Sequence, residues 1–309
     1  MLKTISLTEE ERRQIVNGLN EISGDPYGDS FAEFYFKAKL NTESFPFRVR
    51  KGLENFKENP GSSGVLLIRG MPIDISSKPT PTVSYAEVSD KVVGYEKYLL
   101  TSASMIGEPI GFSDWHRGAY IQNLYPIREL EQVQCASNSV YLEMHTETAF
   151  RPNTPTHLLL LCLKKDPHSH VKTVFCDLAG IIDSMNDAAR KILASPVFCF
   201  EIQGEKGIDH TVPKPIESYE NGIRRLHYAE ALTAIDEESK EILADLKNRI
   251  LHNSVVIELD KGDLVVIDNR HVVHGRTAYS PRFDGNDRWL QRVLIGAPSQ
   301  PDAQPELLN

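Results

Sequence analysis

The sequence predicts a mostly β protein whose double-stranded β-helix (jelly-roll) core is flanked by helices. After residue 101, several short apolar runs typical of strands follow one another without regular strand–helix alternation, which disfavours a doubly wound parallel sheet. The chain has 309 residues, of which 40% are hydrophobic, so it can bury one large core. No repeat of fixed period is visible, so a solenoid or a propeller is not expected.

The first 60 residues are expected to form helices that pack on this core. Thr8 and Glu11 make a capping-box pattern, and Ile15 begins the apolar face of the helix that follows. An apolar run bounded by Gly64 and Gly70 predicts a buried strand. Further helices are expected at 30–39, 43–56 and 85–100. The segment 76–82, which carries prolines and serines, predicts either a lid over a pocket or an ordinary surface loop.

The second half of the chain supplies the expected strands. They are predicted at 158–163, 173–176, 197–201, 255–259, 264–267 and 289–295. One helix interrupts them, with Asp236 as its cap and Leu243 and Leu246 on its apolar face. Residues 261–263, Lys-Gly-Asp between two apolar strands, predict a hairpin turn. We expect a single domain over residues 1–309, with a C-terminal tail at 297–309.

Composition predicts the compartment and excludes some partners. The formal net charge of -9 disfavours a nucleic-acid or anionic-membrane surface, both of which need clustered Lys and Arg. No apolar run approaches the length of a membrane helix, and the N-terminus lacks the apolar core of a signal peptide. The four cysteines show no CxxC spacing, so reduced thiols are expected. These features predict a cytoplasmic protein that binds neither nucleic acid nor membrane, and they leave its oligomeric state open.

Two segments carry side chains that together suit a metal ion. The first contains His145 and Glu147, and alternate residues of a strand point to the same face, so both can reach one metal. The second follows the predicted strand at 264–267 and offers a third ligand in either His271 or His274. Two histidines and one carboxylate, with open positions left over, suit iron(II) in oxygen activation. Taken alone, the His-Thr-Glu triplet also fits a solvated strand face.

An arginine follows at a spacing that suits a second ligand. Arg288 lies fourteen residues after His274, at the start of an apolar strand. Its planar guanidinium can hold a carboxylate through two parallel charge-assisted hydrogen bonds. The alternative for Arg288 is an ion pair with Asp284 or Asp287, although the apolar Trp289 follows it.

Three separated motifs resemble one family of enzymes. They are His145-Thr146-Glu147, His274-Gly275-Arg276 and Asp284-Gly285-Asn286-Asp287-Arg288-Trp289-Leu290-Gln291-Arg292-Val293. Together they resemble the clavaminate-synthase-like branch of the 2-oxoglutarate oxygenases, close to the arginine, asparagine and lysine hydroxylases that act on free amino acids. The resemblance spans residues 64–295 and is specific because the spacing of all three motifs matches. It implies a jelly-roll enzyme that uses Fe(II), 2-oxoglutarate as co-substrate and O2.

The resemblance also implies roles for single residues. His145, Glu147 and His274 would be the iron ligands, with His274 preferred to His271 because the family places the ligand before Gly-Arg. Arg288 would bind the distal carboxylate of 2-oxoglutarate, assisted by the hydroxyl group of Thr173.

For the substrate, the resemblance implies a second group of contacts. Arg292 would bind the amino acid's carboxylate, while Glu147, helped by Gln122, would accept a hydrogen bond from its amine. Glu230 lies near His227 in a segment where relatives carry acidic residues that recognise the substrate side chain. This segment lacks the paired aspartates of the arginine hydroxylase, so recognition of a guanidinium is not implied there.

The predicted function is hydroxylation of an unactivated C–H bond of a free L-amino acid, with a basic one (lysine or arginine) as the expected type. An asparagine- or glutamine-type substrate, a desaturation or a cyclisation are alternatives with the same cofactors. Halogenation is not expected, because related halogenases have a small residue at the position of Glu147. A non-catalytic jelly roll that binds a small ligand is the alternative from a different class.

Overall fold

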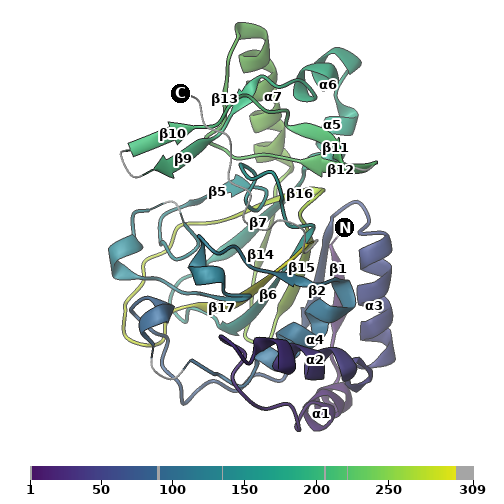
Figure 1. The fold of residues 1–309 in the computed structure, drawn as a ribbon, viewed down its shortest axis with the longest axis vertical. Helices are drawn as coiled ribbons and strands as arrows, with labels where there is room; N and C mark the ends of the chain where they lie inside the picture. Colours follow the sequence, from purple (N-terminus) through teal and green to yellow (C-terminus); the bar gives the residue numbers. More distant parts are fainter. Residues whose placement is uncertain (1, 89–90, 134, 205–206, 221, 297–309) are drawn as a thin grey trace.

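Two facing β-sheets form the centre of the molecule (Figure 1). A computed structural model describes residues 2–88, 91–133, 135–204, 207–220 and 222–296, so the predicted tail at 297–309 lies outside the described residues. The larger sheet has the strand order β1-β2-β15-β6-β17-β3, with β4 also paired to β17, and the smaller sheet has the order β14-β7-β16-β5. The predicted class, a jelly-roll core with flanking helices, is confirmed.

The strands of the larger sheet are β1 (Lys3–Ser6), β2 (Val65–Arg69), β3 (Pro109–Ile110), β4 (Ile121–Leu124), β6 (His157–Lys164), β15 (Leu264–Asp268) and β17 (Trp289–Ile295). Those of the smaller sheet are β5 (Leu142–His145), β7 (Lys172–Asp177), β14 (Val255–Glu258) and β16 (Val272–Arg276). The strands predicted at 158–163, 173–176, 264–267 and 289–295 each lie within one of these strands.

Strand β6 explains why the sequences of the central strands are apolar at successive positions. Successive side chains of a strand point to opposite faces. Leu158 and Leu160 face the apolar layer between the two sheets, which also contains side chains of β7 and β16. Leu159 and Leu161 face the opposite way, into the layer between the larger sheet and the helices. Because both faces are buried, the run 158–163 within this strand is apolar on both sides.

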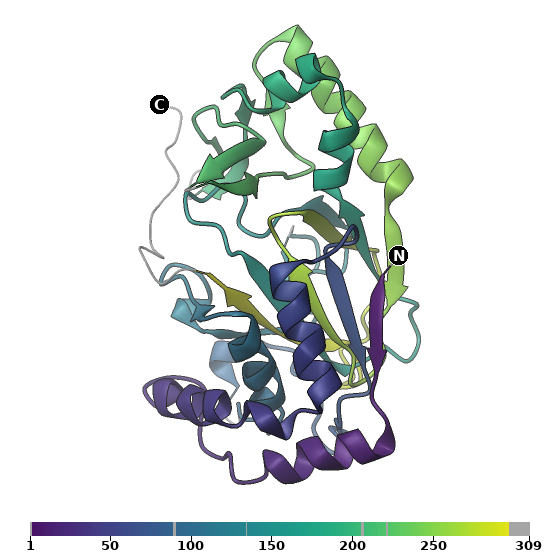
Figure 2. The ribbon, with the colours of Figure 1, turned by 90° about the vertical axis from the view of Figure 1, so that its right-hand side faces the viewer.

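Four helices cover the outer face of the larger sheet (Figure 2). They are α1 (Glu9–Gly18), α2 (Phe31–Leu40), α3 (Phe47–Glu58) and α4 (Glu96–Ile106), and short 3-10 turns lie at η1 (Thr42–Ser44), η2 (Tyr85–Glu87), η3 (His116–Gly118) and η4 (Arg128–Leu130). Thr8 and Glu11 form the predicted capping box. Pro46 interrupts the helix predicted at 43–56, and α3 begins directly after it. In the described part of the chain, no helix has both the length and the apolar character that crossing a bilayer requires.

The helix predicted at 85–100 is wrong over most of its first part. Among the described residues before Glu96, this part contains only the short turn η2, and α4 begins at Glu96. The buried carboxylate of Glu96 accepts the backbone N–H groups of Val93 (2.9 Å) and Gly94 (2.8 Å), and Gly94 has a left-handed φ of 85°. These bonds stabilise a loop in front of the helix, since the donors that a preceding turn would use are already satisfied.

A second group of helices and hairpins, here called the cap layer, lies outside the smaller sheet (Figure 1). It contains α5 (Leu178–Ser184), α6 (Asp187–Leu193), α7 (Glu237–Asn253), β8 (Phe198–Cys199), β9 (Glu201–Gly204), β10 (Gly207–His210), β11 (Glu217–Glu220), β12 (Ile223–Leu226) and β13 (Thr233–Ala234). Asp236 caps α7 as predicted, and Leu243 and Leu246 are buried. The strand predicted at 197–201 is divided between β8 and β9.

The hairpin predicted at residues 261–263 is wrong. Strand β14 belongs to the smaller sheet and β15 to the larger one, so this turn carries the chain from one sheet to the other. Gly262 has a φ of 85°, and its carbonyl accepts the N–H of Met71 at 2.7 Å. A Cβ atom here would lie 2.3 Å from the Met71 carbonyl oxygen, so the turn requires glycine.

Candidate active site

A cavity of about 780 Å³ lies where strands of both sheets meet the cap layer. This volume is within the usual range for small-molecule sites. Its walls come from strands of both sheets, from the segment that precedes β5, and from residues 200–202 and 229–231 beside or within the cap layer. Most of the wall is apolar, including Leu124, Leu158, Leu160 and Leu290, and the polar side chains gather in separate groups.

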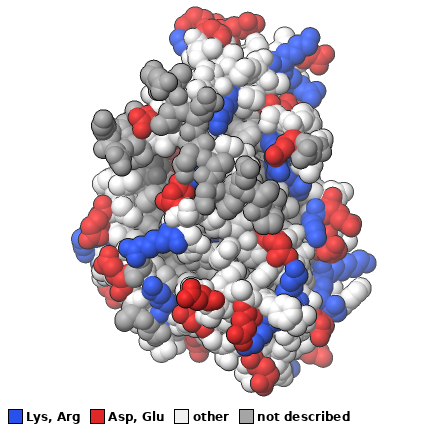
Figure 3. Space-filling view, viewed as in Figure 1, with Lys and Arg blue, Asp and Glu red and all other residues white. Residues whose placement is uncertain are grey.

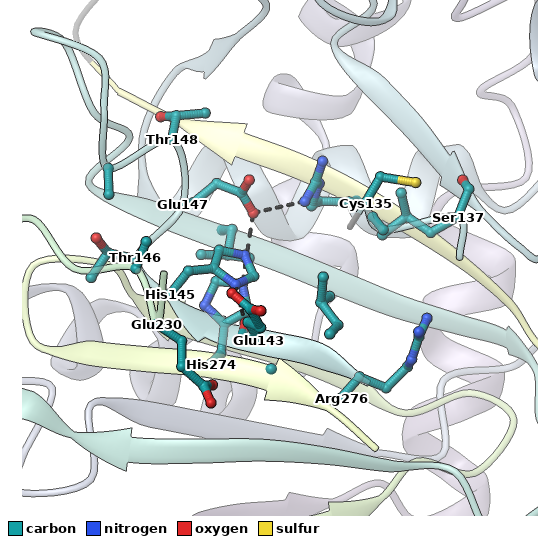
Figure 4. Close-up of a pocket in the computed structure, with 18 of the residues that line it drawn as sticks. Cys135, Ser137, Glu143, His145, Thr146, Glu147, Thr148, Glu230, His274 and Arg276 are labelled. Carbon is teal, nitrogen blue, oxygen red and sulfur yellow. Dashed lines mark hydrogen bonds and ion pairs between the residues drawn. The ribbon is translucent and has the colours of Figure 1, made fainter. Parts of the chain in front are cut away.

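Three predicted ligands meet in this cavity (Figure 4). His145 on β5 and His274 on β16 are directly opposite in the antiparallel register, and their ring centroids are 4.5 Å apart. The Nε2 atom of His274 lies 3.6 Å from Oε2 of Glu147. One potential ligand atom from each residue lies within 4.8 Å of the others. His271 is not in this group, since its Nδ1 atom lies 3.1 Å from Oδ2 of Asp268.

Glu147 is positioned by a turn and not by the strand that the sequence predicted. Strand β5 ends at His145, and Thr148 has a left-handed φ of 52°, which is unusual for a β-branched residue. The side chain of the buried Asn269, which directly follows β15 of the larger sheet, forms two hydrogen bonds with this turn. Its Oδ1 atom accepts the N–H of Glu147 at 2.6 Å, and its Nδ2 atom donates to the Glu147 carbonyl at 3.2 Å.

The protonation states of the three residues suit a divalent metal. Burial lowers the pKa of His145 to about 4, so the ring is neutral at pH 7. Its Nδ1 atom lies 2.7 Å from the Glu143 carbonyl oxygen, so a neutral ring donates its Nδ1–H to that carbonyl. The lone pair of Nε2 is then available to a metal ion. Burial opposes ionisation of Glu147, but Arg292 and His274 hold its pKa well below the usual range. Two imidazoles and one carboxylate fit iron(II) with open positions.

One end of the cavity is positively charged. Arg288 is only 8% exposed, lines the cavity, and has no hydrogen-bond or ion-pair partner among the described residues. Its burial lowers its pKa. Thr173, buried on β7, lines the same wall, and Arg276 is its register partner on β16. Arg276 was not singled out from the sequence, although it lies within the His-Gly-Arg motif; it donates to Asn138 and to the Val140 carbonyl.

Arg292 lies between the metal-ligand group and strand β4. Its Nη1 atom donates to Oε2 of Glu147 at 2.7 Å. Its Nε and Nη2 atoms donate to Oε1 of Gln122 at 2.8 and 2.5 Å, and its guanidinium stacks on the Trp115 ring with a centroid distance of 4.9 Å. Gln122 is its register partner on β4 and does not itself line the cavity. The amide therefore contacts Arg292, where the sequence had suggested contact with a substrate amine.

Two carboxylates line another part of the wall. Glu230 accepts the backbone N–H of Met144 at 3.0 Å and the hydroxyl of Tyr141 at 3.1 Å. Glu143 was missed in the sequence, although it lies two residues before His145 and alternate strand residues share a face. Burial raises the pKa of Glu143, and the charges of Glu230 and Glu201 raise it further.

The loop at 76–82 and the buried His157 lie outside the cavity. The loop at 76–82 does not contribute to its wall; Thr80 instead donates its N–H to the Gly285 carbonyl at 2.7 Å and its hydroxyl to the Asp287 carbonyl at 2.6 Å. His157 is buried at the start of β6, beside Asp268. On the face seen in Figure 3, acidic and basic side chains are interspersed.

Comparisons with known proteins agree with this geometry. Residues 61–294 match the taurine catabolism dioxygenase TauD, TfdA family. The chain is 29% identical to L-asparagine oxygenase of Streptomyces coelicolor over 272 residues, which cover 85% of this chain and 80% of that protein. It is 28% identical to L-lysine 3-hydroxylase of Catenulispora acidiphila over 280 residues, 86% of this chain and 76% of the other. A structure of asparagine oxygenase with Fe(II), 2S,3S-3-hydroxyasparagine and succinate superposes with a TM-score of 0.84 at 26% identity, covering 95% and 93% of the two chains.

Proposed function

Because the chain belongs to the taurine catabolism dioxygenase TauD, TfdA family, we propose that it hydroxylates an unactivated C–H bond of a free L-amino acid. The predicted clavaminate-synthase-like affiliation is confirmed, and so is the predicted class of enzyme, an iron- and 2-oxoglutarate-dependent dioxygenase. The alternative of a non-catalytic ligand-binding jelly roll is therefore not supported. We also propose that residues 1–309 act as a single oxygenase domain, because helices α1–α4 share an apolar layer with the larger sheet.

One observation carries the proposal. The group His145, Glu147 and His274 shares a cavity with Arg288, a buried guanidinium that has no partner among the described residues. A buried charge without a partner is costly unless a ligand compensates it. A dicarboxylate that reaches from the three ligands to Arg288 would satisfy both groups at once.

The residues then have separate tasks. Bound iron(II) would supply oxygen activation: 2-oxoglutarate loses CO2 and becomes succinate, which takes one oxygen atom of O2, while the other oxygen atom enters the product. His145, Glu147 and His274 would hold the metal. Arg288 and Thr173 orient the distal carboxylate of 2-oxoglutarate. The apolar wall excludes water, so the charged groups interact more strongly than they would in solvent.

The amino-acid substrate would be oriented by a second group of residues. Arg292 would receive its carboxylate, and Gln122 supports this role because it fixes two nitrogen atoms of the guanidinium. Glu147 would accept a hydrogen bond from the substrate amine. A basic side chain is the favoured type, with Glu230 as its acidic contact. Asparagine or glutamine is the alternative, which the similarity to an asparagine oxygenase supports.

The test is an aerobic assay with iron(II), ascorbate and 2-oxoglutarate against a panel of free L-amino acids. Succinate and product mass are measured in the same samples. We expect one amino acid to gain a single oxygen atom in step with succinate. A product that has lost two hydrogens would replace hydroxylation by desaturation or cyclisation, and slow succinate formation that no amino acid accelerates would contradict the proposed substrate class.

A further inference from the structure

Arg151 is a buried arginine of the cavity wall that has no task in the proposed function. It lies four residues after Glu147 and is 5% exposed. Its guanidinium stacks on the Phe112 ring with a centroid distance of 4.5 Å and lies 5.5 Å from the centroid of Phe150. Its Nη2 atom donates to Oδ2 of Asp114 at 2.7 Å, whereas its Nε and Nη1 atoms have no hydrogen-bond partner among the described residues. Burying a guanidinium with so few hydrogen bonds is costly, so we expect it to serve the adjoining site.

The carboxylate that Arg151 binds belongs to a strained turn, residues 113–118, here called the strap. Three successive residues of the strap have left-handed φ angles, namely His116 (49°), Arg117 (56°) and Gly118 (76°). Such angles are unfavourable for residues other than glycine, and a turn that contains them persists only when surrounding contacts hold it. The ion pair between Asp114 and Arg151 is one such contact, because it ties the strap to the loop that follows Glu147.

The strap also carries Trp115, which covers one face of Arg292. The Arg292 guanidinium lies 4.9 Å from the centroid of the Trp115 ring. At its edges, Arg292 donates hydrogen bonds to Glu147 and Gln122. The indole ring therefore covers a surface of the guanidinium that these hydrogen bonds leave open. Shielding this surface from water strengthens the attraction between Arg292 and a bound carboxylate.

These contacts form a closed chain that begins and ends at the Glu147 loop. Arg151, at the end of this loop, binds Asp114 of the strap. The next residue of the strap, Trp115, covers Arg292, and Arg292 donates to Glu147 at 2.7 Å. We propose that Arg151 is a positioning residue, which holds Trp115 over Arg292 and so sets the affinity for the amino-acid substrate. The inference rests on the proposed function, in which Arg292 binds the α-carboxylate.

Substitutions at both ends of this contact test the inference. Arg151→Met removes the ion pair and keeps a side chain of similar length between the two phenyl rings. The side chain of Asp114 is 39% exposed, so water can solvate its carboxylate in this variant. Asp114→Asn weakens the same ion pair from its exposed end and gives a second route to the same result. Trp115→Leu removes the flat ring and leaves Arg151 in place. Arg249→Met is the control, because it breaks an ion pair of 2.8 Å within α7, outside the cavity.

The assay measures binding without oxygen, so that it does not depend on turnover. Protein loaded with iron(II) is titrated calorimetrically with 2-oxoglutarate and then with the free L-amino acids of the activity panel, beginning with lysine, arginine and asparagine. Arg151→Met should weaken the amino acid that binds the wild type about tenfold, because a displaced Arg292 no longer meets the carboxylate in the right geometry. Binding of 2-oxoglutarate should stay within about twofold of wild type, and Arg249→Met should stay within about twofold for both ligands.

A double-mutant cycle tests whether Arg151 acts through Trp115. Trp115→Leu alone should weaken the amino acid at least as much as Arg151→Met does. In the Trp115→Leu background, Arg151→Met should weaken it by no more than about twofold further, because the contact that it supports is already gone.

Three results would overturn the inference and leave the proposed function standing. They are unchanged binding of the amino acid by Arg151→Met, equal weakening of 2-oxoglutarate and the amino acid by this variant, and full additivity of the two changes in the cycle. Failure of every amino acid of the panel to bind the wild type would overturn the proposed function and the inference together.

Discussion

Replacing Arg288 by methionine should move the stability of the ligand-free and ligand-bound protein in opposite directions. In the ligand-free protein, Arg288 is a buried charge that has no partner among the described residues. An unsatisfied buried polar group costs about 1–3 kcal/mol, and more when it is charged. Methionine has a similar length and needs no partner, so Arg288→Met should raise the free energy of unfolding of the ligand-free protein by about 1 kcal/mol or more.

The same change should remove the stabilisation that 2-oxoglutarate provides. At a concentration one hundred times its Kd, a ligand stabilises the wild type by about 2.7 kcal/mol. For a chain of this size, that raises the unfolding temperature by roughly 5–10 °C. Losing two charge-assisted hydrogen bonds costs about 3 kcal/mol or more and raises the Kd at least about a hundredfold. The stabilisation at the same concentration then falls to about 0.4 kcal/mol.

The assay is thermal unfolding of iron(II)-loaded protein without oxygen, with and without 2-oxoglutarate. Arg282→Met is the control, because Arg282 is exposed, does not line the cavity, and should change neither value by more than about 0.5 kcal/mol. If Arg288→Met keeps the ligand-dependent rise of the wild type, Arg288 does not hold the co-substrate. If it instead unfolds at a lower temperature without ligand, Arg288 contributes to the fold itself.

Three further changes test other parts of the account. Glu147→Ala should abolish oxygen insertion, measured as hydroxylated product, because it removes the carboxylate from the ligand group. Asn269→Ala should weaken iron(II) binding about 10- to 100-fold in a direct metal titration, since it frees the turn that positions Glu147. Burial lowers the pKa of His157 from 6.5 to about 4. Between these two pH values the unfolded chain binds more protons than the folded protein. The free energy of unfolding therefore decreases as the pH is lowered, by about 2 kcal/mol from pH 6.5 to pH 5. His157→Gln should remove this part of the loss in denaturant titrations.

Each of these expectations has a result that contradicts it. Full activity of Glu147→Ala would exclude Glu147 as a ligand. Unchanged metal affinity in Asn269→Ala would mean that the Glu147 turn is held without this side chain. An equal loss of stability between pH 6.5 and 5 in His157→Gln and wild type would assign the loss to other groups.

The sequence predicted well two kinds of element: strands that are buried on both faces, and helices whose signals lie within the helix or just before it. The run at 158–163 is apolar on both faces because β6 lies between the second sheet and the helices. The capping pattern of Thr8 and the face of α7 are local signals, since the hydrogen bonds and contacts that they describe lie within one helix or just before it.

The misassigned elements depend on contacts that lie far away in the chain. A Lys-Gly-Asp turn is equally compatible with a hairpin and with a crossing between sheets, and only the pairing of β14 and β15 with different partners decides. The apolar residues near 85–100 suggested one long helix. Its start is set by the carboxylate of Glu96, which also accepts from Gln291 on β17.

The candidate site shows the same division. His145, Glu147 and His274 could be proposed from spacing and resemblance, because each lies in a recognisable motif. The contact of Gln122 with Arg292 follows from the register of β4 and β17, which spacing along the chain does not reveal. Glu143 could have been found from strand alternation, but its relation to Glu230 depends on the bridge between β5 and the cap layer.

The most direct test of the central claim uses isotopically labelled dioxygen. The enzyme, iron(II), 2-oxoglutarate and the amino acid that most accelerates succinate formation are incubated under labelled O2, and both products are analysed by mass. The account predicts equal amounts of succinate and hydroxylated amino acid, with one labelled oxygen atom in each. Labelled succinate without any labelled amino acid, at a rate that the amino acid does not change, would contradict it.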